Sequence, residues 1–149
     1  MLTISSDVFL RVMHSCRRAG SCKWFTNSLT SFVRTIQFYR TTTGKCPVEE
    51  FLDSLPDKHT QKVAWVFRLV EGIDIVPKQY FKKLVGTEDL WEIRVQFGRS
   101  SYRFLGFFDG TSFLVLTSGF AKKQQKTPLR EIELARERRA GYLQQKEKL

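Results

Sequence analysis

Four basic side chains have the residue types and the spacing that phosphate binding needs: Arg94, Arg103, Lys122 and Lys123. Side chains alternate from one face of a β-strand to the other, and each arginine stands between apolar neighbours in a strand-like run. The lysine pair directly follows a third such run. We therefore expect the four cations to gather on one face of a sheet, where they can bind a phosphate group and stabilise negative charge that develops on it.

The alternative is an ordinary solvated face, on which Glu92 pairs with Arg94 or Arg103. The chain has 25 Lys and Arg against 15 Asp and Glu, which gives a formal net charge of +10. Such a charge favours polyanionic partners: nucleic acid, an anionic membrane surface or an acidic protein. No helix with a basic face opposite a Trp/Leu face is apparent, so nucleic acid is favoured. Three further basic residues are predicted to bind RNA: Arg99, Lys126 and Arg130.

Other chemistries have weaker support in the sequence. His14 falls in the N-terminal stretch and His59 near the start of a predicted helix, so neither is expected on the sheet and no His-based acid–base pair is indicated. The cysteines, Cys16, Cys22 and Cys46, lack a CxxC spacing and are expected to be free thiols. No glycine-rich nucleotide-binding motif is present. We therefore predict neither a metal nor a cofactor.

The chain divides into three parts by composition. Residues 1–34 hold one acid, several basic residues and many Ser and Thr, with poor periodicity, and are predicted to be a poorly ordered basic extension. A single domain is predicted over 35–143 and a charged tail over 144–149. No apolar run approaches the roughly 18–20 residues that span a bilayer. We expect a soluble, cytoplasmic protein with no membrane partner.

The first half of the domain is predicted to be a strand and a helical hairpin. The β-branched and aromatic run Phe32–Arg40 predicts the strand. One helix should run from Pro47 to about Leu55, and a second, capped by Asp57, should end near Gly72. An apolar stripe along the second helix indicates that the hairpin covers one face of a sheet. Trp65 and Trp91 are expected in the core.

The second half is predicted to be a sheet and a final helix. Three strand-like runs, Leu90–Phe97, Tyr102–Phe108 and Ser112–Phe120, are separated by short turn signals and predict an antiparallel meander. A short run at Tyr80–Val85 is a candidate further strand or lead-in. Thr127 can cap a C-terminal helix in which Pro128 takes the first position. The predicted fold class is therefore α+β, with the arginines on the uncovered face of the sheet.

Several segments of the sequence together resemble the HigB-type, phage-related branch of the RelE toxin superfamily. They are Leu90-Trp91-Glu92-Ile93-Arg94, Tyr102-Arg103-Phe104, Phe107-Phe108-Asp109-Gly110 and the run from Gly119-Phe120 through Lys122-Lys123-Gln124-Gln125-Lys126-Thr127-Pro128. The resemblance covers about residues 35–143. It implies a RelE-like fold: a small antiparallel sheet, an N-terminal helical hairpin packed on one face, and a C-terminal helix.

The resemblance also implies an activity. It suggests the toxin of a type II toxin–antitoxin system, an mRNA interferase that cleaves mRNA on the ribosome without a metal and so inhibits translation. The 2′-hydroxyl of the RNA attacks the adjacent phosphate. Arg103 would be the main phosphate clamp, Arg94 a second cation, and Lys122 with Lys123 the pair near the leaving group. The implied partner is a HigA-like helix-turn-helix antitoxin.

The sequence departs from the family pattern at two points. Position 92 is Glu where some relatives have Lys, so the general base is unassigned. Some relatives use a C-terminal Tyr in catalysis, whereas Tyr142 comes late here and is expected to pack. Two other functions remain open: a ParE-like toxin that inhibits gyrase by binding it, and a non-catalytic RNA- or ribosome-binding module.

Overall fold

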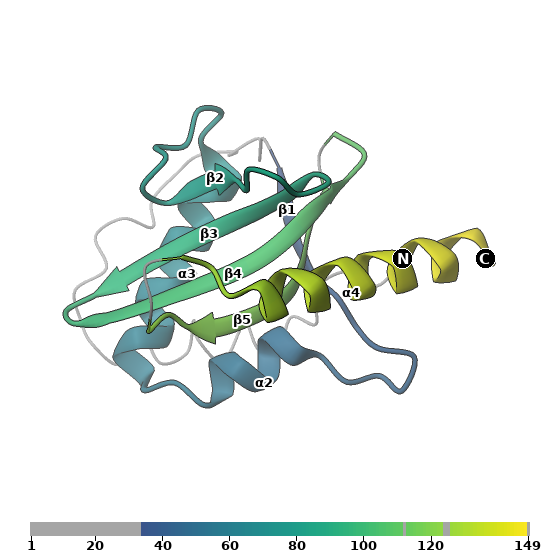
Figure 1. Ribbon diagram of the computed structural model, residues 1–149. Coiled ribbons are helices and arrows are strands. Elements are labelled where there is room, and N and C mark those ends of the chain that lie inside the picture. The colour runs from purple at the N-terminus through teal and green to yellow at the C-terminus, as the bar shows by residue number, and fades with distance from the viewer. Residues whose placement is uncertain (1–33, 112, 124–125, 149) are drawn as a thin grey trace, which may run out of the picture.

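The computed structural model describes residues 34–111, 113–123 and 126–148 (Figure 1). The predicted N-terminal extension therefore lies outside the described residues, apart from Arg34. The Arg34 side chain donates hydrogen bonds to the carbonyl oxygens of Val70 (2.5 Å) and Ile73 (2.9 Å), at the end of helix α3 (Asp57–Gly72). A cation at a helix C-terminus satisfies carbonyls that have no partner within the helix.

Five strands form one sheet in the order β1-β5-β4-β3-β2. Their bounds are β1 Thr35–Phe38, β2 Phe81–Lys83, β3 Leu90–Phe97, β4 Ser100–Asp109 and β5 Phe113–Ala121. Strands β2 to β5 pair antiparallel, as the meander prediction requires, and the candidate strand at Tyr80–Val85 is confirmed as β2. The sheet as a whole is mixed, because β1 pairs parallel with β5. The α+β fold class is confirmed.

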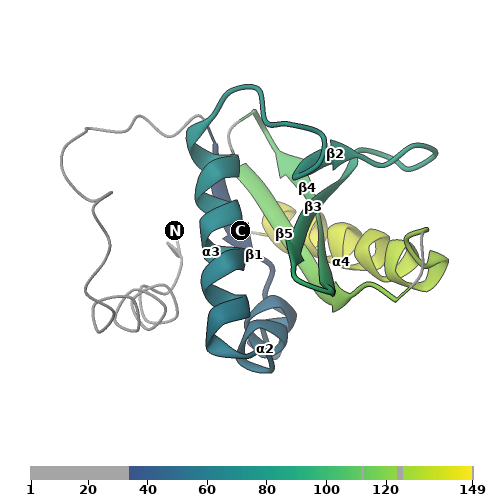
Figure 2. The same ribbon diagram turned by 90° about the vertical axis from the view of Figure 1, so that its left-hand side faces the viewer.

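The helical hairpin covers one face of the sheet, as predicted. It consists of α2 (Pro47–Asp53) and α3, which lie together on one side of the strands in Figure 2. Buried residues of α3, among them Val66 and Val70, pack in one core with Ile93 and Phe104 of the sheet. The helix caps differ from the prediction: Asp57 is the first helical residue and makes no side-chain cap hydrogen bond, because Pro56 occupies the cap position.

Helix α4 (Leu129–Glu147) lies on the opposite side of the sheet from α2 and α3 (Figure 2). Its buried Ala135 packs in a second, smaller core with Leu105, Phe107 and Val115. The prediction of an uncovered arginine face is therefore wrong for the half of that face near the β4–β5 turn. Apolar side chains of the strands alternate onto this side as well, and α4 removes them from water.

Three side chains fasten α4 to the sheet. The Tyr142 hydroxyl (2.9 Å) and the Lys146 ammonium (2.8 Å) both donate to the carboxylate of Asp109, at the end of β4. The Arg138 guanidinium donates to the backbone carbonyl of Thr117 in β5 (2.7 Å). The Tyr142 ring also packs against Phe107, as expected of a packing residue.

Two further expectations concern exposure. Trp91 packs against the first core, but Trp65 is 48% exposed and lies edge-on to Tyr80, so its assignment to the core is wrong. Trp65 lies on the side of α3 that faces away from the strands, so the sheet does not cover it. Within the described residues, no helix is long and apolar enough to cross a membrane.

Candidate functional site

Arg94 of β3 and Arg103 of β4 are directly opposite each other in the antiparallel register. The two strands are joined by the two-residue turn Gly98-Arg99, and Gly98 has a φ of 56°, a left-handed conformation that glycine adopts more readily than residues with a Cβ atom. This tight turn fixes the register. The sheet therefore brings together the two arginines that the sequence singled out, on the face that α2 and α3 leave free.

Glu92 lies beside the arginine pair and is completely buried. Its Oε2 accepts a 2.7 Å hydrogen bond from Nε of Arg94, and its Oε1 lies 3.6 Å from Nε of Arg103. The same Oε1 accepts a 2.8 Å hydrogen bond from the hydroxyl of Thr127. The predicted pairing of Glu92 with an arginine is thus present, but as a buried group and not on a solvated face.

Arg103 is the more enclosed of the two arginines. Its side chain is 12% exposed, against 27% for Arg94. Its Nη1 donates to the carbonyl of Tyr102 (2.9 Å), while its Nε is buried without a hydrogen-bond partner. Burial lowers the pKa of Arg103 and the charge of Arg94 acts in the same direction, against the effect of Glu92. A guanidinium nevertheless stays charged in a protein, so the site keeps two cations around one carboxylate.

A β-bulge in β5 determines which of its side chains face this site. The register of β4 and β5 shifts between Leu105 and Gly106, which leaves Thr117 as an extra residue of β5. Beyond the bulge, Phe120 is the cross-strand partner of Arg103. Because side chains alternate, this shift by one residue turns Phe120, and not its neighbours, toward the arginine face.

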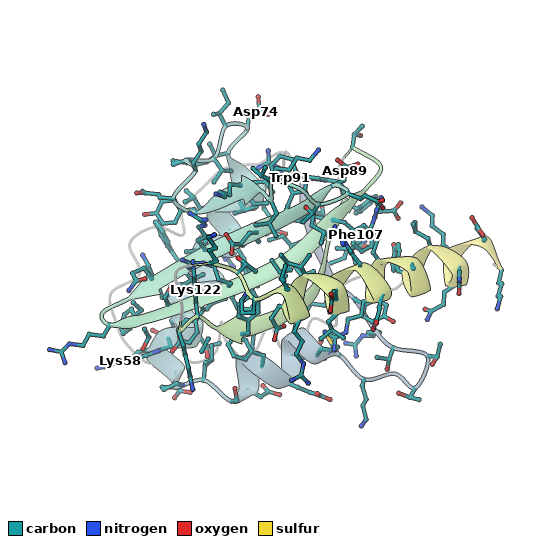
Figure 3. All side chains as sticks on the ribbon, in the orientation of Figure 1. Lys58, Asp74, Asp89, Trp91, Phe107 and Lys122 are labelled. Atoms are coloured by element: carbon teal, nitrogen blue, oxygen red, sulfur yellow. The ribbon has the colours of Figure 1, made fainter. Side chains whose placement is uncertain are left out.

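Lys122 joins the same cluster just beyond β5. Its backbone N–H donates to the carbonyl of Ser101 (2.7 Å), which extends the β4–β5 ladder by one residue. Burial lowers the pKa of Lys122, and the positive charges of Arg103, Arg94 and Lys82 lower it further, while Glu92 opposes them. In Figure 3, Lys122 lies at the opposite end of this face from Phe107, which is under α4. The sheet end that α4 leaves open is therefore strongly cationic.

The remaining predicted residues lie outside this cluster. Lys123 is exposed and is not among the charges that act on Lys122. Arg99 is exposed in the β3–β4 turn, Lys126 is exposed just before α4, and Arg130 is exposed in its first turn. These residues surround the site at a distance, as solvated cations.

Sequence reasoning missed two members of the site. Lys82 of β2 is the cross-strand partner of Glu92 and is half-buried on the same face. Alternation within Tyr80–Val85 could have indicated it, had the pairing of that run with β3 been known. Thr127 was expected to cap α4. Its hydroxyl instead binds Glu92, and Pro128 holds the cap position without a side-chain hydrogen bond.

The sequence also raised histidine and metal chemistry. His59 does reach the sheet, where its Nδ1 bonds with the hydroxyl of Tyr102, but on the side covered by α2 and α3. Within residues 34–111, 113–123 and 126–148, no group of three or more His, Cys, Asp or Glu is placed to hold a metal ion. The described groups around Glu92 are hydrogen-bond donors, which suits the binding of an anion.

The family comparison covers all the residues of this cluster. A family model described as "Phage derived protein Gp49-like (DUF891)" matches residues 50–140, more than half of the chain. The matched region begins in α2 and ends in α4, so it includes Lys82, Glu92 and Lys122 together with both arginines. No curated protein matches the chain.

Proposed function

The chain belongs to the Gp49-like family of phage-derived proteins, which is part of the RelE toxin-like group, and we propose that it is a toxin that cleaves mRNA on the ribosome. Its neutralising partner would be a helix-turn-helix antitoxin of the HigA type. Translation would stop because ribosome-bound messages are cut.

The observation that carries this proposal is the direct pairing of Arg94 with Arg103 around a buried carboxylate. Placing two guanidinium groups side by side is costly for the free protein, because like charges on opposite residues of a strand pair repel each other. A single Glu92 offsets only part of that charge. A bound phosphate would supply the remaining negative charge, and its oxygens match the donor geometry of guanidinium groups.

The proposed reaction uses this charge at the transition state. The 2′-oxygen of the RNA attacks the neighbouring phosphorus, the bond from phosphorus to the 5′-oxygen breaks, and the products are a cyclic phosphate and a 5′-hydroxyl. Negative charge accumulates on the phosphoryl oxygens during attack. Arg103 and Arg94 are preorganised by the sheet to donate hydrogen bonds to those oxygens, which is the usual source of the largest rate effect.

Two protons must move in this reaction. One leaves the 2′-hydroxyl and one reaches the departing 5′-oxygen. Lys122 is the described group with the most suitable environment, because its lowered pKa increases the neutral, proton-accepting fraction near pH 7. Lys123 and the other exposed cations would hold more distant phosphates of the message or of ribosomal RNA.

The test is a cleavage assay with purified protein and ribosomes that carry a defined mRNA. We expect fragments with 5′-hydroxyl ends, which accept a phosphate from a kinase without prior dephosphorylation. Arg103→Ala should lower the cleavage rate by about 100-fold or more, the usual cost of one transition-state donor. Lys58→Ala is the matched control, because Lys58 is an exposed cation on α3, on the other side of the sheet (Figure 3).

The same assay separates the alternatives. Tight, salt-sensitive binding to ribosomes without any cut message would favour a non-catalytic binding module. Inhibition of gyrase with intact messages would favour a ParE-like toxin. Unchanged cleavage by a folded Arg103→Ala variant would contradict the assignment of Arg103 as the phosphate clamp.

A further inference from the structure

Among the described residues, Glu92 is the acidic group at the centre of the cationic cluster, and both of its oxygens are engaged. Oε2 accepts from Arg94, and Oε1 accepts from Thr127 and faces Nε of Arg103. The side chain has no exposed surface. A carboxylate in this position cannot reach a 2′-hydroxyl to take its proton, so its contribution to the reaction must be made through its neighbours.

The contacts of Glu92 determine how the two guanidinium groups are presented. For Arg94, the carboxylate takes Nε, and neither Nη nitrogen has a partner among the described residues. For Arg103, Nη1 is taken by the Tyr102 carbonyl and Nε faces Glu92, so Nη2 is the group left over. With Arg94 bonded through Nε and Arg103 bonded through Nη1, both Nη nitrogens of Arg94 and Nη2 of Arg103 are available to bind a phosphate.

Thr127 connects this arrangement to the start of α4. It lies 35 residues from Glu92 in sequence, yet its hydroxyl donates to the Glu92 carboxylate over 2.8 Å. The loss of one donor from a buried carboxylate costs more than an average hydrogen bond, because the oxygen cannot turn to water instead. The carboxylate would then move toward the remaining donors and take the arginines with it.

We propose that Thr127 and Glu92 are positioning residues of this site: the start of α4 holds the carboxylate, and the carboxylate orients Arg94 and Arg103 toward the phosphate. The catalytic consequence rests on the proposed function, whereas the orientation of Arg94 does not. A site assembled in this way is complete only when Thr127, just before α4, lies within hydrogen-bond distance of Glu92 in β3.

Thr127→Val is the central variant, because it keeps the shape of the side chain and removes only the hydroxyl. We expect the Nε–H proton of Arg94 to be protected from solvent exchange in the unchanged protein and to exchange faster in Thr127→Val. Nitrogen–proton NMR spectra report this directly, with the signal assigned by its loss in Arg94→Lys. Thr127→Ser restores the donor and should restore the protection.

Cleavage kinetics give the second measurement. We expect Thr127→Val to lower kcat by about 10- to 100-fold, the range expected when reacting groups are slightly misplaced, with KM nearly unchanged. Thr127→Ser should recover most of the rate. Thr87→Val is the matched control, because the Thr87 hydroxyl also makes one hydrogen bond (2.8 Å to the carbonyl of Leu84) but lies away from the cluster.

The two measurements can fail separately. If no form of the protein cuts mRNA, the proposed function fails, while exchange of the Arg94 proton still decides whether Thr127 positions it. If the folded Thr127→Val variant keeps both the protection and the full kcat, the positioning role is overturned. If Thr127→Val does not fold, Thr127→Ser is compared with Thr127→Ala in the same way, and failure of Ser to differ from Ala overturns the proposal.

Discussion

Lys82 and Glu92 are directly opposite each other on β2 and β3, yet the Glu92 carboxylate is bound by Arg94 and Thr127 and not by Lys82. No hydrogen bond or ion pair of the Lys82 ammonium is found in the described part of the chain. Lys82 is therefore a cation beside Glu92, and we infer that its charge is available to a ligand.

We expect Lys82→Ala to weaken binding of an uncleavable, 2′-deoxy-substituted RNA by about 5- to 10-fold, as for one charge-assisted contact. The slope of log affinity against log salt should fall by about one unit. The adjacent Lys83→Ala is the control, because Lys83 lies on the opposite face and pairs with Asp89. Equal losses in the two variants would mean that only net charge matters.

Glu71 gives a prediction about pH and stability. It is buried at the edge of β1, where it accepts a 2.9 Å hydrogen bond from the backbone N–H of Ile36. Burial raises its pKa above the ordinary value of 4.5, despite the opposing hydrogen bond and the charge of Arg68. The folded protein thus holds the Glu71 proton more tightly than the unfolded chain. The resulting contribution to the free energy of unfolding is complete below pH 4.5 and is lost as the pH rises through the raised pKa of Glu71.

Glu71→Gln should therefore remove a decline in the free energy of unfolding as the pH rises above 4.5, while the amide oxygen keeps the bond to Ile36. Urea denaturation at several pH values measures this. Glu50→Gln, on the exposed side of α2, controls for the lost charge. The prediction fails if the variant and the unchanged protein have parallel stability curves over this range.

Tyr142 gives a second prediction, at high pH. Burial and its hydrogen bond to Asp109 raise the pKa of Tyr142 to about 12, from an ordinary value of 10. The proton is held more tightly in the folded protein, so this stabilisation is complete below pH 10 and is lost as the pH rises through 12. Tyrosinate absorbance should show a titration step near pH 12, and Tyr142→Phe should abolish that step.

Tyr142→Phe should also lower the free energy of unfolding at pH 7 by about 1 kcal/mol, because the hydrogen bond is lost while the packing on Phe107 is kept. Tyr80→Phe is the control, since no hydrogen bond of the Tyr80 hydroxyl is seen in the described residues. A late titration step that persists in Tyr142→Phe would show that another tyrosine is responsible.

Gly119 gives a prediction about packing. A Cβ atom at this position would lie 2.6 Å from a ring carbon of Phe51 and 2.7 Å from one of Phe104. These two rings pack edge to face between α2 and β4, with centroids 5.7 Å apart. Gly119→Ala should therefore lower the free energy of unfolding by about 1–3 kcal/mol, the usual cost of overpacking.

Gly72→Ala is the matched control, because nothing lies within 4 Å of a Cβ there and the residue is the last of α3. Alanine has the higher helix propensity, so this variant should be as stable as the unchanged protein or slightly more stable. Thermal unfolding of both variants measures the difference. Equal stability of the two would mean that Phe51 and Phe104 can move apart at little cost.

The helices and strands and the cationic character of the site can be read from the amino-acid sequence alone. Alternation around Arg94 and Arg103 placed both arginines away from the core, and turn residues such as Gly98 and Gly110 marked the hairpins. These are local properties, set by backbone geometry and by the period of apolar side chains, so they can be seen within a few residues.

The way in which these residues come together depends on the tertiary structure. The bulge at Thr117 turns Lys122 toward the arginines, and no local sequence pattern predicts a single extra residue in one strand of a pair. The buried Glu92 is bonded to Thr127, which folding brings from 35 residues away. Such contacts depend on the path of the whole chain across the sheet, which is why the sequence could name Glu92 as an arginine partner but not its burial, its bond to Thr127 or the nearby Lys82.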